Sequence, residues 1–279
     1  IDLIITAHQH QTIVGKDHET VYVQAGQNAE ELVHLSIHFK KRTSSYEIDN
    51  IESKVIDLND YNEDEALLNE THYDRKAVEY WADEIISNNK FNLAIDSIED
   101  IICQPHPFAQ LLHDGIKTAY NHEISCVHLP INGEEGLSGV VRNRDLYEAY
   151  PHPDKPVDLT VRGKNIKDIL EYSYSHIEFE QGKLSLTIVD ETLFTFWQGI
   201  NYTVDMNQEP YQRVKIENID EEQMYRITMT DYCYRNYKDY LKDAIVHETH
   251  DETMGGLIRN NLKKADYNIK VTNNFKVNL

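Results

Sequence analysis

The chain opens on an apolar run that ends in a His-x-His pair. Residues 1–5 read Ile-Asp-Leu-Ile-Ile, and Thr6-Ala7-His8-Gln9-His10 follow. We interpret the run as a β-strand, and α/β folds place their ligands at the carboxyl edge of such strands. Side chains two positions apart on a strand share a face, so we expect His8 and His10 to converge. Two imidazoles suit Zn²⁺, Mn²⁺ or Fe²⁺, and the pattern predicts a metal site. A surface histidine pair is the alternative, because the chain holds 14 His.

Composition restricts the partners of this chain. The formal charge of −21 argues against binding polymeric nucleic acid but allows a mononucleotide, which needs only one cationic pocket. No run of about 18 apolar residues predicts a membrane span. The three cysteines, Cys103, Cys126 and Cys233, are too few for a disulfide framework. They favour a cytoplasmic protein, and a secreted or cell-surface protein with a signal peptide is the alternative.

Periodicity divides the 279 residues into three parts. We expect the tail of a sheet domain over residues 1–56, a linker and connecting helix over 57–90, and a second domain over 91–279. Alternating or apolar runs predict strands at 21–26, 32–39, 124–131, 157–161, 183–189, 199–205, 212–216 and 225–230. Helical spacing predicts helices from Tyr73 through Ile85 and at 107–120, 144–150 and 163–175.

Several short motifs follow one another in a set order along the chain. They are Ala7-His8-Gln9-His10, Val23-Gln24-Ala25-Gly26, Asn132-Gly133, Arg144 to Pro151, Val157 to Gly163, Phe194 to Asp205, and Tyr225 to Tyr232. In this order they resemble the 5′-nucleotidase and 2′,3′-cyclic nucleotide phosphodiesterase family. The resemblance implies an α/β (α+β) fold. Its parts would be the C-terminal part of a two-layer metallophosphoesterase sheet, a linker helix and a 5′-nucleotidase C-terminal-type domain.

For the first domain, the resemblance implies a metal-dependent phosphoric ester hydrolase acting on nucleotides. His8 would bind one divalent ion and His10 the other, with Mn, Zn or Fe as the two metals in the intact protein. The remaining ligands and the catalytic residues would lie upstream, so we expect the fragment to be inactive. Two sequences imitate ligand motifs: 121–123 reads as a helix terminus, and 247–251 as a solvated acidic loop.

For the second domain, the resemblance implies a nucleotide pocket. Phe194 and Tyr232 would hold the base between facing rings, with Phe196 or Trp197 as alternatives to Phe194. Asn132 or Asp231 would read an edge of the base, and Arg142 or Arg144 would lie on the phosphate side. The chain departs from the family at Glu134-Glu135 and in the loop 233–239, which contains no glycine. A cyclic nucleotide, a nucleotide-sugar or a dinucleotide therefore stays open as the substrate.

Two other readings of the sequence remain open. The first is a non-catalytic nucleotide-binding module derived from the same family. The second is a complete α/β protein without metal. For the protein itself we expect a monomer or homodimer with a small-molecule nucleotide as its partner. His106 and His152 each stand next to proline, in Pro105-His106-Pro107 and Pro151-His152-Pro153. We interpret both first as turn or helix-entry residues, and as site residues second.

Overall fold

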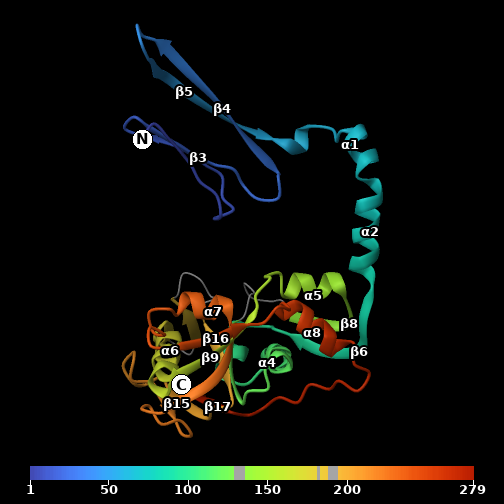
Figure 1. Ribbon diagram of the computed structural model, residues 1–279, viewed down its shortest axis with the longest axis vertical. Helices are drawn as coiled ribbons and strands as arrows, with labels where there is room; N and C mark the ends of the chain where they lie inside the picture. The colour runs from blue at the N-terminus through green and yellow to red at the C-terminus, as the bar shows by residue number, and fades with distance from the viewer. Residues whose placement is uncertain (129–135, 181–182, 188–193) are drawn as a thin grey trace. The chain divides into compact units, whose positions relative to one another are not determined.

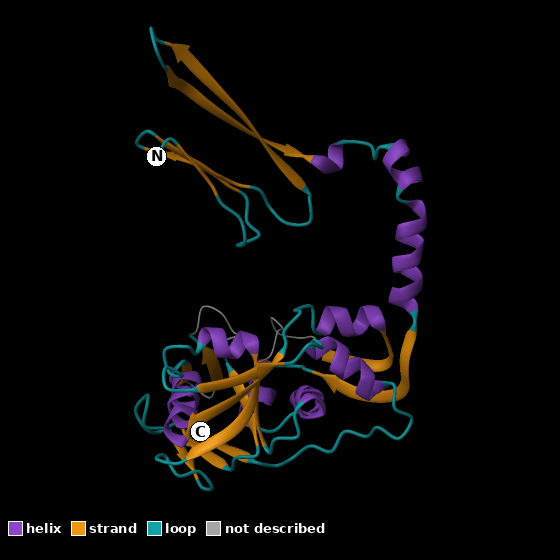
Figure 2. Cartoon of the chain, viewed as in Figure 1, coloured by secondary structure: helices purple, strands orange, loops and turns teal. Residues whose placement is uncertain are grey.

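The structure is a computed structural model that describes residues 1–128, 136–180, 183–187 and 194–279 (Figures 1 and 2). The chain forms two compact units, residues 1–76 and residues 77–279.

The first unit contains two small sheets. Strands β1 (Leu3–Ile5), β2 (Ile13–Asp17) and β3 (Thr20–Gln24) form one sheet in the order β1-β3-β2, with β1 parallel to β3. Strands β4 (Glu31–Lys41) and β5 (Tyr46–Asp57) form a separate antiparallel pair. The strand expected at residues 32–39 is present as β4, but it does not join the sheet of β1, β2 and β3. The reason is that the long run 46–57, which carried no prediction, pairs with β4 along its length.

Short helices follow the second sheet. A 3₁₀ turn spans Leu58–Asp60, α1 spans Glu65–Glu70 and α2 spans His72–Asp83. Asp64 caps α1, because its carboxylate accepts hydrogen bonds from the backbone N–H groups of Ala66 and Leu67. The expected connecting helix is confirmed. It ends at Asp83, however, because strand β6 (Ile85–Ala94) begins at Ile85.

The second unit is built on a five-stranded sheet in the order β12-β7-β15-β9-β16. Its strands are β7 (Ile124–His128), β9 (Pro156–Arg162), β12 (Thr195–Gln198), β15 (Met224–Thr230) and β16 (Ile245–Thr249). Only β7 and β15 run parallel, and the other neighbours are antiparallel. Residues 247–249, which we expected in a loop, lie in β16 because they pair with β9 at Val157 and Asp158.

Smaller elements surround this sheet (Figure 1). The helices are α3 (Ile98–Cys103), α4 (Pro107–Ala119), α5 (Asn143–Ala149), α6 (Gly163–Ser175), α7 (Asp231–Asn236) and α8 (Met254–Leu262). The further strands are β8 (Gly136–Arg142), β10 (Ile177–Glu180), β11 (Lys183–Leu186), β13 (Tyr202–Asp205), β14 (Val214–Ile216) and β17 (Phe275–Asn278). The helices expected at 107–120, 144–150 and 163–175 are confirmed to within one residue.

The core of the second unit lies between these helices and the sheet. Phe108, Leu111, Leu112 and Ile116 of α4 are fully buried, at the spacing of one helical face. His106 is the N-cap of α4, where its Nδ1 accepts a hydrogen bond from Phe108 N at 3.1 Å, so the helix-entry interpretation is confirmed. Among the described residues, no helix combines the length and hydropathy needed to cross a lipid bilayer.

His113 makes the stability of this unit depend on pH. Its ring is 3% exposed on α4 and lies 2.8 Å from Ser125 Oγ of β7. Burial lowers the pKa of His113 from 6.5 to about 3. Because the folded pKa lies below the unfolded one, the unfolded chain binds more protons below pH 6.5. The stabilisation is therefore complete above pH 6.5 and is lost as the pH falls towards 3.

We expect the unfolding free energy to fall by about 1.4 kcal/mol per pH unit in this window from His113 alone. Denaturant titrations of wild-type protein and His113→Gln at several pH values would measure this. His113→Gln should flatten the slope, while His72→Gln, at an exposed position on α2, should leave it unchanged. Equal slopes for all three proteins would contradict the assignment.

Candidate functional site

Three chain segments meet at one edge of the central sheet. The parallel strands β7 and β15 end at His128 and Thr230. Strand β9 runs antiparallel to β15 and pairs Pro156 with Thr230, so the turn that precedes β9 lies at the same edge. Ligands of open α/β sheets bind outside the carboxyl ends of strands. This edge is therefore a candidate ligand site.

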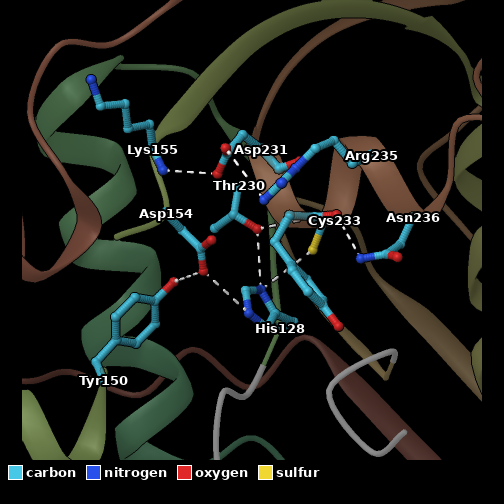
Figure 3. Close-up of polar contacts among 10 residues, drawn as sticks. His128, Tyr150, Asp154, Lys155, Thr230, Asp231, Cys233, Arg235 and Asn236 are labelled. Atoms are coloured by element: carbon cyan, nitrogen blue, oxygen red, sulfur yellow. Dashed lines mark hydrogen bonds and ion pairs between the residues drawn. The ribbon is translucent and has the colours of Figure 1, made fainter. Parts of the chain in front are cut away.

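A buried polar cluster occupies this edge (Figure 3). His128, with its side chain 1% exposed, lies between two strands and a turn. Its Nδ1 is 3.1 Å from Thr230 Oγ1, and its Nε2 is 3.4 Å from Asp154 Oδ2. Nε2 makes no hydrogen bond with any described residue. The buried ring therefore makes a hydrogen bond with Thr230 through Nδ1 and lies within ion-pair distance of Asp154 through Nε2.

Neighbouring side chains enclose the His128 ring. Tyr150 donates a hydrogen bond to Asp154 Oδ2 at 3.1 Å, and burial together with the Asp154 charge raises the pKa of the Tyr150 hydroxyl. Cys233 Sγ lies 3.7 Å from His128 Nδ1. Burial, followed by the contact with Cys233, raises the pKa of the Cys126 thiol. Tyr150 and Cys126 therefore stay neutral at physiological pH.

Tyr232 covers the His128 ring. The two rings are stacked, with centroids 4.3 Å apart and planes at 27°. Tyr232 is half-buried in the first turn of α7. Thr230 caps this helix, because its Oγ1 accepts a hydrogen bond from Cys233 N at 3.3 Å. The N-cap at Thr230 positions the first turn of α7, and the buried His128 ring supports one face of the Tyr232 ring.

Asp231 binds the turn before β9 to α7. Its Oδ1 accepts a hydrogen bond from Lys155 N at 2.9 Å, and its own N–H donates to Lys155 O at 2.8 Å. Arg235 Nη2 lies 3.6 Å from Asp231 Oδ2 (Figure 3). The side chain of Asp231 is 31% exposed, so one part of the carboxylate stays open to solvent.

The two arginines predicted for the phosphate side differ in their partners. Arg144 pairs with Asp83, with Nη2 2.8 Å from the Asp83 carboxylate. Arg142 is the N-cap of α5, where its backbone N–H donates to Asp145 Oδ2 at 2.7 Å. The Arg142 guanidinium has no partner among the described residues. Asn132, the other predicted base-edge residue, lies outside the described residues.

The aromatic residues predicted opposite Tyr232 lie in the core. Phe194 is 3% exposed, and its ring packs 5.1 Å from those of Tyr174 and Phe196. Phe196 and Trp197 are 4% and 2% exposed. Phe194 immediately precedes β12, Phe196 and Trp197 lie in this strand, and its first residue, Thr195, pairs with His128 of β7. In this structure, Tyr232 is the predicted aromatic whose ring is half-buried and lies at the sheet edge.

His8 and His10 follow β1 and are exposed. Strand β1 ends at Ile5 and both histidines have left-handed backbone, with φ of 88° and 54°, so the alternation of strand side chains does not extend to them. Non-glycine residues adopt this region rarely and mostly in turns. Among the described residues, no three His, Cys, Asp or Glu side chains gather closely enough to hold a metal ion.

Sequence reasoning missed the residues behind Tyr232. His128 ends the apolar run Ile124-Ser125-Cys126-Val127, so a titratable residue at a strand end was a usable signal. Asp154 follows Pro151-His152-Pro153, and of these residues only His152 was considered as a site residue. Thr230 and Cys233 gave no signal of their own. Their role depends on the packing of α7 against the sheet.

Comparisons with known proteins agree with this fold. The sequence profile described as 5′-nucleotidase, C-terminal domain matches residues 91–243. No curated protein matches the chain. The structure is similar to a Staphylococcus aureus protein assigned as a 5′-nucleotidase and solved with α-ketoglutarate, with 23% identity and a TM-score of 0.80. This match covers 99% of the chain and 56% of the other protein.

Two further solved structures share the fold. One is a 5′-nucleotidase precursor from Thermus thermophilus, with 15% identity, a TM-score of 0.57, and coverage of 98% of this chain and 57% of the other. The other is the NAD nucleotidase of Haemophilus influenzae, with 13% identity, a TM-score of 0.54, and coverage of 99% and 62%. The chain thus spans little more than half of each of these proteins.

Proposed function

The chain belongs to the 5′-nucleotidase family through its C-terminal domain, and from this premise we propose that its second unit binds the base of a nucleotide. The substrate would be hydrolysed at its phosphate ester by a metal-dependent phosphoesterase domain. Residues 1–56 would supply only the tail of that domain. The ring of Tyr232, held over His128 at the edge of the sheet, is the observation that carries the proposal.

A nucleobase has a wide apolar face, and an aromatic ring that is held in place binds it by stacking. One face of the Tyr232 ring lies on His128. Its half-buried position leaves part of the ring accessible to a ligand. Stacking on such a ring contributes about 1–3 kcal/mol per base. Because the ring is already ordered by its neighbours, little side-chain entropy is lost on binding.

Polar residues of the second unit would read the edges of the base and bind its phosphate. The partly exposed carboxylate of Asp231 accepts hydrogen bonds, as the amino group of a purine or cytosine requires. Arg142 has a guanidinium without a partner among the described residues, whereas Arg144 is held by Asp83. We therefore assign the phosphate side to Arg142 in preference to Arg144. Asn132 is the alternative to Asp231 as the residue that would read an edge of the base.

The metal part of the proposal rests on His8 and His10. Two imidazoles that follow a strand have the donor chemistry of a Zn²⁺, Mn²⁺ or Fe²⁺ site. Two donors are fewer than such a site needs, and no third joins them among the described residues. Bound divalent ions would polarise the phosphate and activate a water molecule.

The test of base binding is Tyr232→Ala. We expect this change to weaken binding of adenosine 5′-monophosphate to the chain by about 1–3 kcal/mol, roughly tenfold or more, because one stacking face is lost. Tyr232→Phe should retain most of the affinity. Isothermal titration calorimetry on both variants and on Tyr80→Ala, an exposed tyrosine of α2, would measure this.

The same titration separates the proposal from its alternatives. Unchanged affinity in Tyr232→Ala would remove Tyr232 from the base site. Tighter binding of a cyclic nucleotide or a dinucleotide than of the monophosphate would change the substrate class. Nucleotide binding without hydrolysis in the longer protein would support the non-catalytic binding module.

A further inference from the structure

A concave site lies in the second unit and does not include Tyr232. It is a cavity of about 300 Å³ between α2, α5, α8 and the turn 150–153. Trp81, Tyr147, His152, Gly255 and Arg259 line it. We propose that this cavity binds a small planar aromatic ligand that carries an anionic group.

The lining favours a flat ring. Trp81 and Tyr147 are large aromatic side chains that remain 47% and 61% exposed. The rings of Pro151 and Pro153 and the bare backbone of Gly255 and Gly256 also line the cavity. Such surfaces are flat and apolar, and aromatic rings pack on them face to face or edge to face. The volume is at the lower end for ligand pockets, which fits one ring system.

Hydrogen bonds hold the walls of the cavity in place. Asn143 Nδ2 donates to Trp81 O at 2.8 Å and to Glu84 Oε2 at 3.1 Å. Arg259 Nε donates to Asn143 Oδ1 at 2.7 Å, and its Nη2 donates to Glu84 Oε2 at 2.9 Å. These bonds join the end of α2 to α5 and α8. The cavity is thus formed before any ligand arrives, as in most small-molecule sites.

The charges at the cavity favour an anion. Glu84 is neutralised by two cations, because Lys263 Nζ also lies 2.9 Å from its Oε1. The hydrogen bond from Lys263 and that from Asn143 lower the pKa of Glu84, so the carboxylate stays ionised. Within the group of Glu84, Arg259 and Lys263 one positive charge is left over, and Arg259, which lines the cavity, has N–H groups that no described residue uses. The carboxylate of Glu252 lies beside Gly256, so the anionic group of the ligand is assigned to the Arg259 side of the cavity. In a chain of formal charge −21, such a local excess is distinctive.

The cavity is separate from the base site but adjoins it. Tyr150 lines the cavity, and its hydroxyl donates to Asp154, which lies beside the His128 ring. Tyr232 is not part of the lining. Ligand binding in this cavity therefore does not depend on whether Tyr232 binds a base.

The test uses benzoate as the probe and the full 279-residue chain. We expect saturable shifts of the Trp81 indole N–H signal in ¹H–¹⁵N NMR spectra, with the signal assigned from Trp81→Phe. Benzyl alcohol, which lacks the charge, should bind about tenfold more weakly, because a charge-assisted hydrogen bond is lost. Cyclohexanecarboxylate, which lacks the flat ring, should also bind more weakly than benzoate.

A variant that fills the cavity gives the decisive comparison. A side chain at Gly255 would start in open space, so Gly255→Phe should fold normally and abolish benzoate binding. Asn260→Phe, at an exposed position of the same helix, should bind as wild type does. Tyr232→Ala should also retain benzoate binding. Absence of saturable shifts in the wild type, or equal binding by Gly255→Phe, would overturn the inference.

Discussion

Replacing Phe194 with alanine is expected to destabilise the second unit by about 3–5 kcal/mol, as large-to-small changes of buried aromatic residues do. The ring is 3% exposed and packs against Tyr174 and Phe196, so its removal leaves a cavity that neither neighbour can fill. Denaturant unfolding, followed by the fluorescence of buried Trp197, would measure the change. This result would assign Phe194 to the core.

The control for Phe194 is Phe179→Ala. Phe179 is 38% exposed on β10, so its removal should change the unfolding free energy by less than about 1 kcal/mol. In the folded fraction of Phe194→Ala, nucleotide affinity should change less than in Tyr232→Ala. A large loss of affinity with little loss of stability would instead return Phe194 to the base site.

The second large effect concerns the metal proposal. In a protein that joins residues 1–279 to the remaining ligands, His8→Ala or His10→Ala should slow nucleotide hydrolysis by about 10³-fold or more. Metal ions supply several kcal/mol of transition-state stabilisation, and about 1.4 kcal/mol corresponds to a factor of ten in rate. The measurement is the hydrolysis rate with Mn²⁺, together with metal content by mass spectrometry.

His38→Ala provides the matched control for the metal prediction. His38 is an exposed histidine of β4, outside the His-x-His pair. It should keep both the rate and the metal content. If the His8→Ala and His10→Ala variants bind as much metal as the wild type, neither imidazole is a metal ligand.

The amino-acid sequence by itself determined the local elements. The helices α4 and α6 were predictable because their apolar residues recur at helical spacing, and this spacing is a property of neighbouring residues. Strands β9 and β15 were predictable because alternating or continuous apolar runs are also a property of neighbouring residues. The ordered motifs also led to the 5′-nucleotidase family, and the profile match over residues 91–243 confirms it.

Tertiary structure alone decided how these elements combine. The backbone at His8 and His10 is left-handed, which strand periodicity does not encode. Phe194 and Tyr232 are both aromatic, and only packing made one a core residue and the other a ring at the sheet edge.

The candidate site shows the same division. Tyr232 and Asp231 were found from a motif, whereas His128 and Asp154 behind them were not. His128 meets Thr230 across 102 residues of sequence, because parallel strands β7 and β15 end at one edge of the sheet. A contact of this kind depends on strand order, which arises when distant apolar faces are buried together. No short pattern in the chain records that order.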